Sequence, residues 1–325
     1  MKTIAIVCGG YSREEVISLR SAEQIVQVID KQKYETFTIL INKEKWVAKI
    51  PGKDIPVAKD DFSFIMNGRK VSFDAVFMAI HGAPGEDGRL QAYFEMIGIP
   101  VTTCNVFVSA LTFNKFATKL FVKEYGILTA DALMFHKGKS IDTRVIAKRF
   151  GFPMFVKPNN GGSSFGVTKV KEMAQLEPAI EKAFAEDTEI IIEPFIEGGE
   201  YTCGVFKSDT ETLLLPVTEI VSKTEFFHFE AKYTKGMSEE ITPARLSPEK
   251  TKECQELSSK IYDLLGCNGV VRIDYLKKED QFYFMEINTV PGMSAESIIP
   301  QQARAYGLTV TEFYTKLIED ALTRG

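Results

Sequence analysis

Apolar runs typical of buried strands alternate with helical patterns along the first hundred residues. Strands are predicted at residues 3–7, 36–41 and 75–80, and helically spaced apolar positions predict helices at 12–29 and 90–98. This alternation is typical of a parallel sheet with helices on its faces. We therefore expect ligands to bind at the carboxyl ends of these strands, as they do in open α/β sheets.

The rest of the chain divides into two further regions. A second unit starts near Val101, and its pattern predicts helices at 110–126 and 142–150, strands at 154–157 and 167–171, a helix at 174–185 and a strand at 189–193. After it we expect antiparallel strands, an irregular stretch near 221–243, a helix at 248–265 and terminal helices. The expected domains of this α/β fold, α+β in part, are residues 1–100, 101–194 and 195–325.

Polar side chains interrupt two apolar runs that flank the polar turn 277–281, a pattern that predicts a hairpin. Because strand side chains alternate between faces, Arg272 and Asp274 share one face. Glu286 and Asn288 share a face on the second strand for the same reason. Carboxylate and amide oxygens suit Mg²⁺ held beside substrate phosphates. The alternative is an exposed face with a structural arginine–carboxylate pair.

The composition excludes several classes of function. At 325 residues, with 45% hydrophobic and 26% charged residues, it is that of a soluble globular protein. A net charge of −5 provides no general attraction for nucleic acid or an anionic membrane, and no apolar run approaches the roughly 18 residues of a membrane span. The five cysteines are scattered and there are three histidines, so we expect no zinc site and a reducing, cytoplasmic compartment.

A glycine-rich loop between two strands, at residues 155–166, is a candidate phosphate site. Its backbone N–H groups, with the hydroxyls of Ser163 and Ser164, could surround a phosphate, and Lys157 adds a cation. The spacing matches neither the Walker pattern nor GxGxxG after a strand. The alternative is a flexible hairpin tip.

Two further stretches could contribute to a nucleotide site. Residues 190–196 leave a buried strand for a connector, where apolar walls and backbone groups could hold adenine and Glu200 could accept ribose hydroxyls. A domain linker is the alternative. The long loop near 226–236 is a candidate lid from which Lys232 could reach a phosphoryl oxygen and Tyr233 a substrate. Its phenylalanines are better explained as anchors to the core.

Two loops lie at the predicted ligand-binding edge of the first sheet. His81, Glu86 and Asp87 form a polar loop after one strand. Glu14 follows the first strand and could hold an ammonium group. A first-turn acid favoured by the helix dipole is the alternative for Glu14.

Together these stretches resemble the ATP-grasp ligases, and within them the D-alanine–D-alanine ligases. Six motifs in order carry the resemblance: HGxxGEDGxxQ at 81–91, the lysine of Phe113-Asn114-Lys115, VKPxxxGSSxG at 156–166, EAKY at 230–233, RIDY at 272–275 and MEINTxPGM at 285–293. The resemblance implies an N-terminal α/β domain followed by a two-part ATP-grasp fold. It implies ATP-dependent joining of two D-alanines through D-alanyl phosphate, for peptidoglycan synthesis. D-Lactate or D-serine as acceptor, or another carboxylate–amine ligation, is the alternative.

The resemblance also implies roles for matching residues. ATP would contact Lys115, Lys157, Ser164, Glu193, Ile196, Glu200 and Lys232. The implied catalytic residues are Glu14, Ser163 and Arg272. D-Alanine would contact Glu14, His81, Tyr233, Gly292, Ser297 and Ile298. Two Mg²⁺ ions, for which Mn²⁺ could substitute, would be held by Asp274, Glu286 and Asn288.

The chain departs from the family pattern at a few positions. Pro194 stands where relatives usually carry lysine, and proline has no N–H to offer. Tyr233 is present, which favours D-alanine over a hydroxy acid as acceptor. A nucleotide-binding regulator without catalysis would have lost some of Asp274, Glu286, Asn288 and Arg272, and all four are present. The family suggests a homodimer, and we expect neither nucleic acid nor membrane as a partner.

Overall fold

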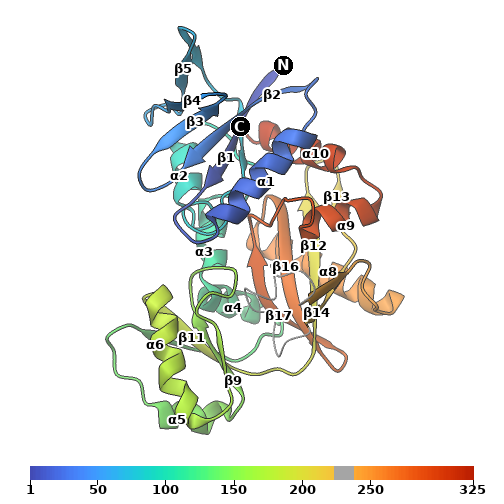
Figure 1. The fold of residues 1–325 in the computed structure, drawn as a ribbon. Coiled ribbons are helices and arrows are strands. Elements are labelled where there is room, and N and C mark those ends of the chain that lie inside the picture. The colour runs from blue at the N-terminus through green and yellow to red at the C-terminus, as the bar shows by residue number, and fades with distance from the viewer. Residues whose placement is uncertain (223–237) are drawn as a thin grey trace.

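Three principal β-sheets with packed helices make up the computed structural model, which describes residues 1–222 and 238–325 (Figure 1). The predicted lid roles of Lys232 and Tyr233 fall outside the described residues. No helix within the described ranges is both long and apolar enough to cross a bilayer.

The N-terminal sheet has the strand order β4-β3-β2-β1-β7. Its strands are β1 (Lys2–Gly9), β2 (Tyr34–Ile41), β3 (Trp46–Ile50), β4 (Lys53–Pro56) and β7 (Ala75–Met78). The pairs of β1 with β2 and with β7 are parallel, which confirms the prediction, whereas β3 and β4 add an antiparallel edge that was not predicted. Helices α1 (Glu15–Val28) and α2 (Arg89–Met96) belong to this unit, as does the separate hairpin of β5 (Phe64–Met66) and β6 (Arg69–Val71).

The central sheet has the order β10-β9-β11-β8, and all its pairs are antiparallel. Its strands are β8 (Leu133–His136), β9 (Met154–Pro158), β10 (Thr168–Val170) and β11 (Glu189–Pro194). Helix α5 (Thr143–Phe150), a short 3₁₀ turn (Met173–Gln175) and α6 (Leu176–Glu186) complete the unit. The predicted elements here are confirmed, but β8 was missed.

The single helix predicted at 110–126 is wrong, because the structure has two helices there. These are α3 (Val106–Phe113) and α4 (Lys115–Glu124). Asn114 between them has extended backbone angles, and its side chain accepts from the Ala117 N–H at 2.9 Å. Asparagine competes in this way with helical backbone bonds, so it ends one helix and caps the next. The break places Lys115 at the first position of α4.

The C-terminal sheet has the order β15-β14-β12-β16-β17, with β13 paired to β12. Its strands are β12 (Gly199–Lys207), β13 (Thr212–Leu214), β14 (Thr218–Ser222), β15 (Ser238–Ile241), β16 (Gly269–Lys278) and β17 (Gln281–Asn288). The helices are α8 (Pro248–Leu265), α9 (Ile298–Tyr306) and α10 (Val310–Thr323). Helix α8 has the predicted bounds. Buried residues of α3 and α4, Val108 and Val122, join the core of this sheet rather than that of the central one.

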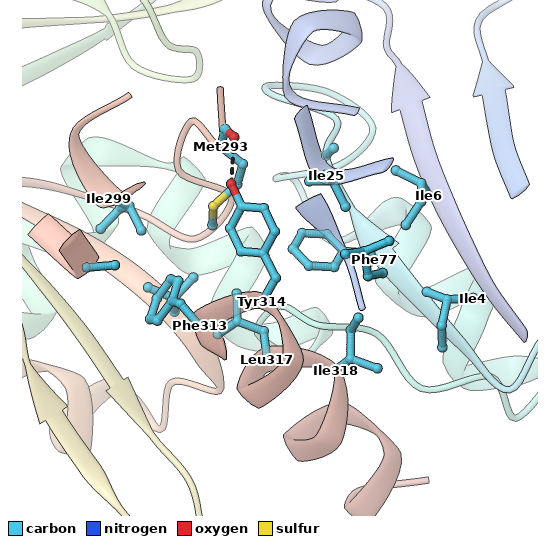
Figure 2. Close-up of a cluster of buried hydrophobic side chains, with 14 of the residues drawn as sticks. Ile4, Ile6, Ile25, Phe77, Met293, Ile299, Phe313, Tyr314, Leu317 and Ile318 are labelled. Atoms are coloured by element: carbon cyan, nitrogen blue, oxygen red, sulfur yellow. Dashed lines mark hydrogen bonds between the residues drawn. The ribbon is translucent and has the colours of Figure 1, made fainter. Parts of the chain in front are cut away.

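The C-terminal helix α10 packs against the first sheet (Figure 2). Its Phe313 and Tyr314 are fully buried in a cluster that includes Ile4 and Ile6 of β1. Tyr314 Oη donates a 2.6 Å hydrogen bond to the Met293 carbonyl. Since large aromatic side chains dominate the energy of a core, this cluster holds the first sheet and the turn at Met293 in a fixed relation.

Candidate active site

A cleft of about 1850 Å³ opens between the three sheets. Its walls come from the loop after β1, helix α4, the glycine-rich loop between β9 and β10, the end of β11 and the β16–β17 hairpin. Every described residue that the sequence analysis assigned to a site lines this cleft: Glu14, His81, Lys115, Lys157, Ser163, Ser164, Glu193, Ile196, Glu200, Arg272, Asp274, Glu286, Asn288, Gly292, Ser297 and Ile298. The fold therefore brings the separate motifs together.

The paired strands β16 and β17 present polar side chains to the cleft. Their register places Arg272 opposite Asn288. It places Asp274 opposite Glu286, so the predicted shared faces are confirmed. Arg272 donates to both carboxylate oxygens of Asp274, at 2.9 and 2.8 Å, and the Asn288 amide donates to it at 3.0 Å. The fully buried Thr202 hydroxyl, from β12, donates to Asp274 at 2.5 Å.

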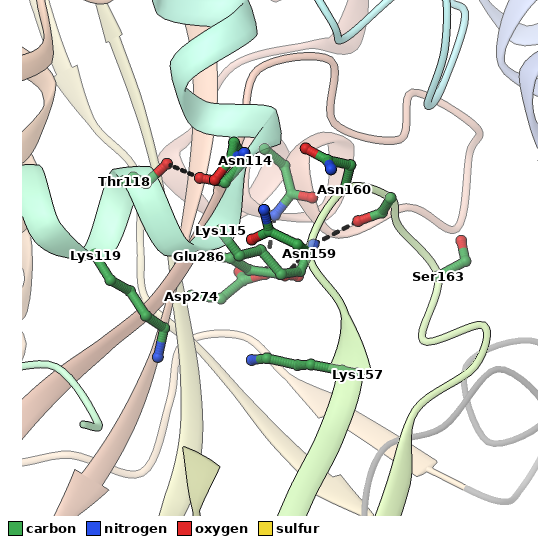
Figure 3. A network of polar contacts seen from close by, with 12 residues as sticks. Asn114, Lys115, Thr118, Lys119, Lys157, Asn159, Asn160, Ser163, Asp274 and Glu286 are labelled. Carbon is green, nitrogen blue, oxygen red and sulfur yellow. Dashed lines mark hydrogen bonds and ion pairs between the residues drawn. The ribbon is translucent and has the colours of Figure 1, made fainter. Parts of the chain in front are cut away.

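Glu286, the second carboxylate of the hairpin, faces a lysine of helix α4. Lys115 Nζ lies 3.4 Å from Glu286 Oε2, and Figure 3 shows the two side chains together beside Asp274. Across the described part of the chain, no three His, Cys, Asp or Glu side chains gather into a metal cluster. The donor set is therefore two carboxylates and the amide of Asn288. It suits Mg²⁺, which commonly takes one or two protein carboxylates and completes its shell with phosphates and water.

The glycine-rich loop contacts the N-terminal domain. The Ser163 hydroxyl donates to Glu14 Oε1. A Cβ added at Gly162 would lie 2.9 Å from the same oxygen, so the loop backbone packs closely against the Glu14 carboxylate. Arg13 stacks 5.5 Å from the centre of the Phe165 ring. At the other side of the loop, Lys115 Nζ donates to the Gly161 carbonyl at 2.5 Å. The loop thus lies over the cleft with both of its sides held.

Glu193, at the end of β11 where the chain enters the connector to β12, lies between two lysines. We call it the hinge glutamate. Glu193 Oε1 is 2.6 Å from Lys119 Nζ, and Oε2 is 2.9 Å from Lys157 Nζ. Burial would raise the pKa of Glu193, but the two lysines outweigh it and hold the pKa below its usual value. Burial lowers the pKa of Lys119, against the attraction of Glu193. Sequence reasoning missed Lys119, although it follows Lys115 by four positions and so shares its helix face.

His81 uses both ring nitrogens to hold neighbouring segments. Nδ1 lies 2.8 Å from the Val290 carbonyl and must donate to it, because a carbonyl only accepts. Nε2 then accepts from the Ser21 hydroxyl at 3.1 Å, and Ser21 Oγ accepts from the Met293 N–H at 3.3 Å. Burial lowers the pKa of His81, so the ring is neutral at pH 7. The histidine therefore joins α1 to the turn that follows β17.

Glu86, five positions beyond His81, supports the same turn. Its carboxylate accepts from the Gly82 N–H at 2.8 Å and from the Val290 N–H at 3.2 Å. Burial, with the nearby charge of Glu14, raises the pKa of Glu86 to about 8. Glu86 was expected only as part of a polar loop, and no motif in the sequence gives it this supporting role.

The start of α9 forms the far end of the cleft. Ser297 occupies the N-cap position, and its hydroxyl lies 2.7 Å from that of Ser294. A Cβ at Gly292 would lie 2.8 Å from Ser297 Oγ, so the backbone of this turn packs closely against the start of α9. The exposed N–H groups and dipole of a helix N-terminus attract a carboxylate, so Ser297 and Ile298 provide a suitable place for one.

An open α/β domain followed by two subdomains that enclose a cleft, with a glycine-rich loop on one wall and paired carboxylates on the other, defines an ATP-grasp ligase. The family model for the D-ala D-ala ligase N-terminus matches residues 3–104, and that for the D-ala D-ala ligase C-terminus matches residues 121–319. The chain belongs to the D-ala D-ala ligase family.

Curated relatives and solved structures agree with this assignment. The chain is 49% identical over 323 residues to a D-alanine–D-alanine ligase of Parabacteroides distasonis, covering 99% of this chain and 98% of the relative. It is 48% identical over 321 residues to that of Phocaeicola vulgatus, covering 98% and 99%. The structure of a D-Ala:D-Ser ligase from Enterococcus faecalis matches with a TM-score of 0.88, 34% identity and 98% of each chain. That of a D-alanine–D-alanine ligase from Bacillus anthracis complexed with ATP has a TM-score of 0.79, with 29% identity over 99% and 98% of the two chains.

Proposed function

We propose that the cleft catalyses ATP-dependent ligation of two D-alanine molecules to D-alanyl-D-alanine, with release of ADP and phosphate, in the synthesis of peptidoglycan precursors. The chain is an ATP-dependent, peptide-bond-forming ligase, as its family and curated relatives support. The observation that carries the proposal is that one cleft collects the glycine-rich loop, the hinge glutamate, the paired carboxylates and Glu14. D-Alanine is favoured as acceptor over D-lactate and D-serine by the curated relatives.

The carboxylate of the first D-alanine must be activated, because a carboxylate is a poor acyl donor. An oxygen of the first D-alanine takes the γ-phosphoryl group of ATP, and ADP leaves. The neutral amine of the second D-alanine then attacks the acyl carbon of D-alanyl phosphate, loses a proton, and phosphate leaves. Positioning and electrostatic stabilisation supply most of the catalysis of phosphoryl transfer. No covalent intermediate with the protein is required.

The nucleotide subsite lies between α4, the glycine-rich loop and the hinge. Lys115 and Lys157 supply positive charge for the phosphate chain, and the loop that carries Ser164 covers it. Adenine lies against Glu193 and Ile196, with the ribose hydroxyls at Glu200. Lys232 is proposed for the phosphates as well, although it lies outside the described residues.

Asp274, Glu286 and Asn288 are proposed to hold two Mg²⁺ ions. The oxygen donor set supports this proposal because it suits the ion, and each carboxylate has a cationic neighbour, Arg272 or Lys115. When bound, Mg²⁺ neutralises the charge on the transferring phosphoryl oxygens. Arg272 donates two N–H groups to Asp274, and this anchors its guanidinium where the oxyanion of the second step develops.

The two D-alanine subsites lie on either side of the reacting carbon. Glu14, held by Ser163, accepts the ammonium of the first D-alanine, and Tyr233, outside the described residues, is proposed to lie beside it. Neutral His81 forms the adjoining wall. The second D-alanine places its carboxylate at the N-terminus of α9, on Ser297 and Ile298, while the Gly292 backbone assists Arg272.

Three further expectations accompany the activity. We keep residues 1–100, 101–194 and 195–325 as proposed domains, which the separate sheets support, although α3 and α4 pack in the core of the C-terminal sheet. A reducing cytoplasm is supported by the five buried, free cysteines. A homodimer is proposed from the family alone, and light scattering of the purified protein tests it.

Release of inorganic phosphate tests the activity. We expect phosphate release that requires ATP, Mg²⁺ and D-alanine. L-Alanine should not support it. If ATP binds but no D-amino acid stimulates release, the ligase proposal is wrong. A panel of D-alanine, D-serine and D-lactate as acceptors then determines the product. Arg272→Met and Glu286→Gln should each abolish turnover in folded protein, and activity in both would disprove the proposed site.

A further inference from the structure

A buried lysine, Lys119, contacts the hinge glutamate, Glu193, at the wall of the cleft. Its side chain is 5% exposed and that of Glu193 is 8% exposed, with 2.6 Å between Lys119 Nζ and Glu193 Oε1. Figure 3 shows Lys119, on α4, and Lys157, on β9, with their amino ends directed toward each other. Charges buried to this degree are retained only when they are paired.

A purely structural ion pair does not need this arrangement. Lys157 already lies 2.9 Å from Glu193 Oε2, so one lysine is available to neutralise the carboxylate. Burial lowers the pKa of Lys119 against the attraction of Glu193, and the like charge of Lys157 lowers it further. A costly arrangement of three charged groups at the wall of a cleft indicates a functional requirement rather than added stability.

The two oxygens of Glu193 have different surroundings. Oε1 is buried, and within the described residues no donor meets it in hydrogen-bond geometry, although the Lys119 charge lies beside it. Oε2 lies on the side of Lys157, and all three side chains line the cleft. Lys119 therefore holds the Oε1 side of the carboxylate and Lys157 the Oε2 side, so the two lysines together fix how Glu193 faces the cleft.

An ionised carboxylate only accepts hydrogen bonds. Adenine presents an amino donor at its position 6, whereas hypoxanthine and guanine present a carbonyl acceptor there, which a carboxylate repels. Pro194, the next residue, has no N–H with which to bind such a carbonyl. We infer that Lys119 is a positioning residue that keeps Glu193 ionised and oriented so that the site selects a 6-aminopurine nucleotide over a 6-oxopurine one. The inference rests on the proposed function of the cleft as a nucleotide-dependent ligase.

The ratio of kcat/KM for ATP to kcat/KM for ITP measures this selection. The enzyme is assayed for D-alanine-dependent phosphate release with each nucleotide. Lys119→Met is expected to lower the ratio by about tenfold or more, the effect of weakening one hydrogen bond to a charged group. Glu193→Gln is expected to lower it similarly, and adding Lys119→Met to Glu193→Gln to lower it no further. Lys119→Arg should restore part of the ratio, and exposed Lys123→Met, one helical turn away, should leave it unchanged.

Because both nucleotides are tested on one preparation, loss of folded enzyme does not change the ratio. An unchanged ratio in Lys119→Met, or an equal further loss in the Glu193→Gln background, would overturn the inference. If Lys119→Met does not fold, Lys119→Gln is measured with the same expectation. Calorimetry with non-hydrolysable analogues of ATP and ITP measures the selection without D-alanine. Absence of D-alanine-dependent turnover in the unaltered enzyme would thus disprove the proposed function, while the binding ratio would still decide the inference.

Discussion

Replacing Thr202 with valine removes one hydroxyl from behind the proposed metal ligand. Thr202 is fully buried, Asp274 is 4% exposed, and 2.5 Å separates the hydroxyl from the carboxylate oxygen. Valine has nearly the same volume as threonine, so the change removes the hydrogen bond without opening a large cavity. Two consequences are expected, one for stability and one for metal affinity.

The size of both effects follows from the contacts of Asp274. A hydrogen bond to a charged group contributes about 1.5–3 kcal/mol. Since Arg272 still donates two bonds to Asp274 and Asn288 one, we expect the low end, a loss of about 1.5 kcal/mol in the free energy of unfolding. Residues that orient a metal ligand change affinity by about 10–100-fold, and the remaining bonds favour the lower figure of about tenfold.

Two assays separate these effects. Urea unfolding without metal measures stability, and calorimetric titration of Mg²⁺ in the presence of a non-hydrolysable ATP analogue measures affinity. Thr202→Ser keeps the hydroxyl and is the matched control. Unchanged stability in Thr202→Val would refute the strength assigned to the bond. Unchanged Mg²⁺ affinity with reduced stability would show that Thr202 does not orient a metal ligand.

Three other substitutions test the surroundings of the site. The folded state holds a proton on Glu86, because the pKa of its carboxyl group is raised from 4.5 to about 8. The thermal midpoint should therefore fall as pH rises through that window, and Glu86→Gln should flatten the fall. A plot of midpoint against pH for the variant that runs parallel to that of the unaltered protein would contradict this. Asn114→Ala removes the 2.9 Å cap on the Ala117 N–H and should cost about 1 kcal/mol in urea unfolding, whereas no loss would show that the cap is dispensable. Tyr314→Phe leaves the buried Met293 carbonyl without its 2.6 Å donor and should cost about 1–3 kcal/mol, and an unchanged urea midpoint would argue against that bond.

Local patterns predicted much of the fold and several relations within the site. The shared faces of the β16–β17 hairpin followed from the two-residue period of a strand, and the register confirms them. The bounds of α8 were predicted correctly, and the structure has Ser247 as its N-cap and Gly266 as a left-handed C-cap. These features depend on neighbours in sequence, which is why the sequence alone was sufficient.

Other features depended on contacts that local patterns do not encode. Strand β8 was missed because its residues gain their pairing from β11, some fifty positions later. The break at Asn114 was missed because the apolar periodicity continues across it. Lys119 and Thr202 have no motif of their own, and their importance appears only through Glu193 and Asp274, which other segments provide.

The sequence by itself determined the family, many of the helices and strands, and which residue types are available for phosphate, metal and amino-acid binding. It did so because motif spacing and side-chain periodicity are properties of neighbouring positions. Only the tertiary structure decided which charges are paired, which groups are buried and which pKa values are displaced. Glu193 between two lysines and Asp274 between Thr202 and Arg272 exist only after distant segments pack, because burial and charge pairing are set by distances through space.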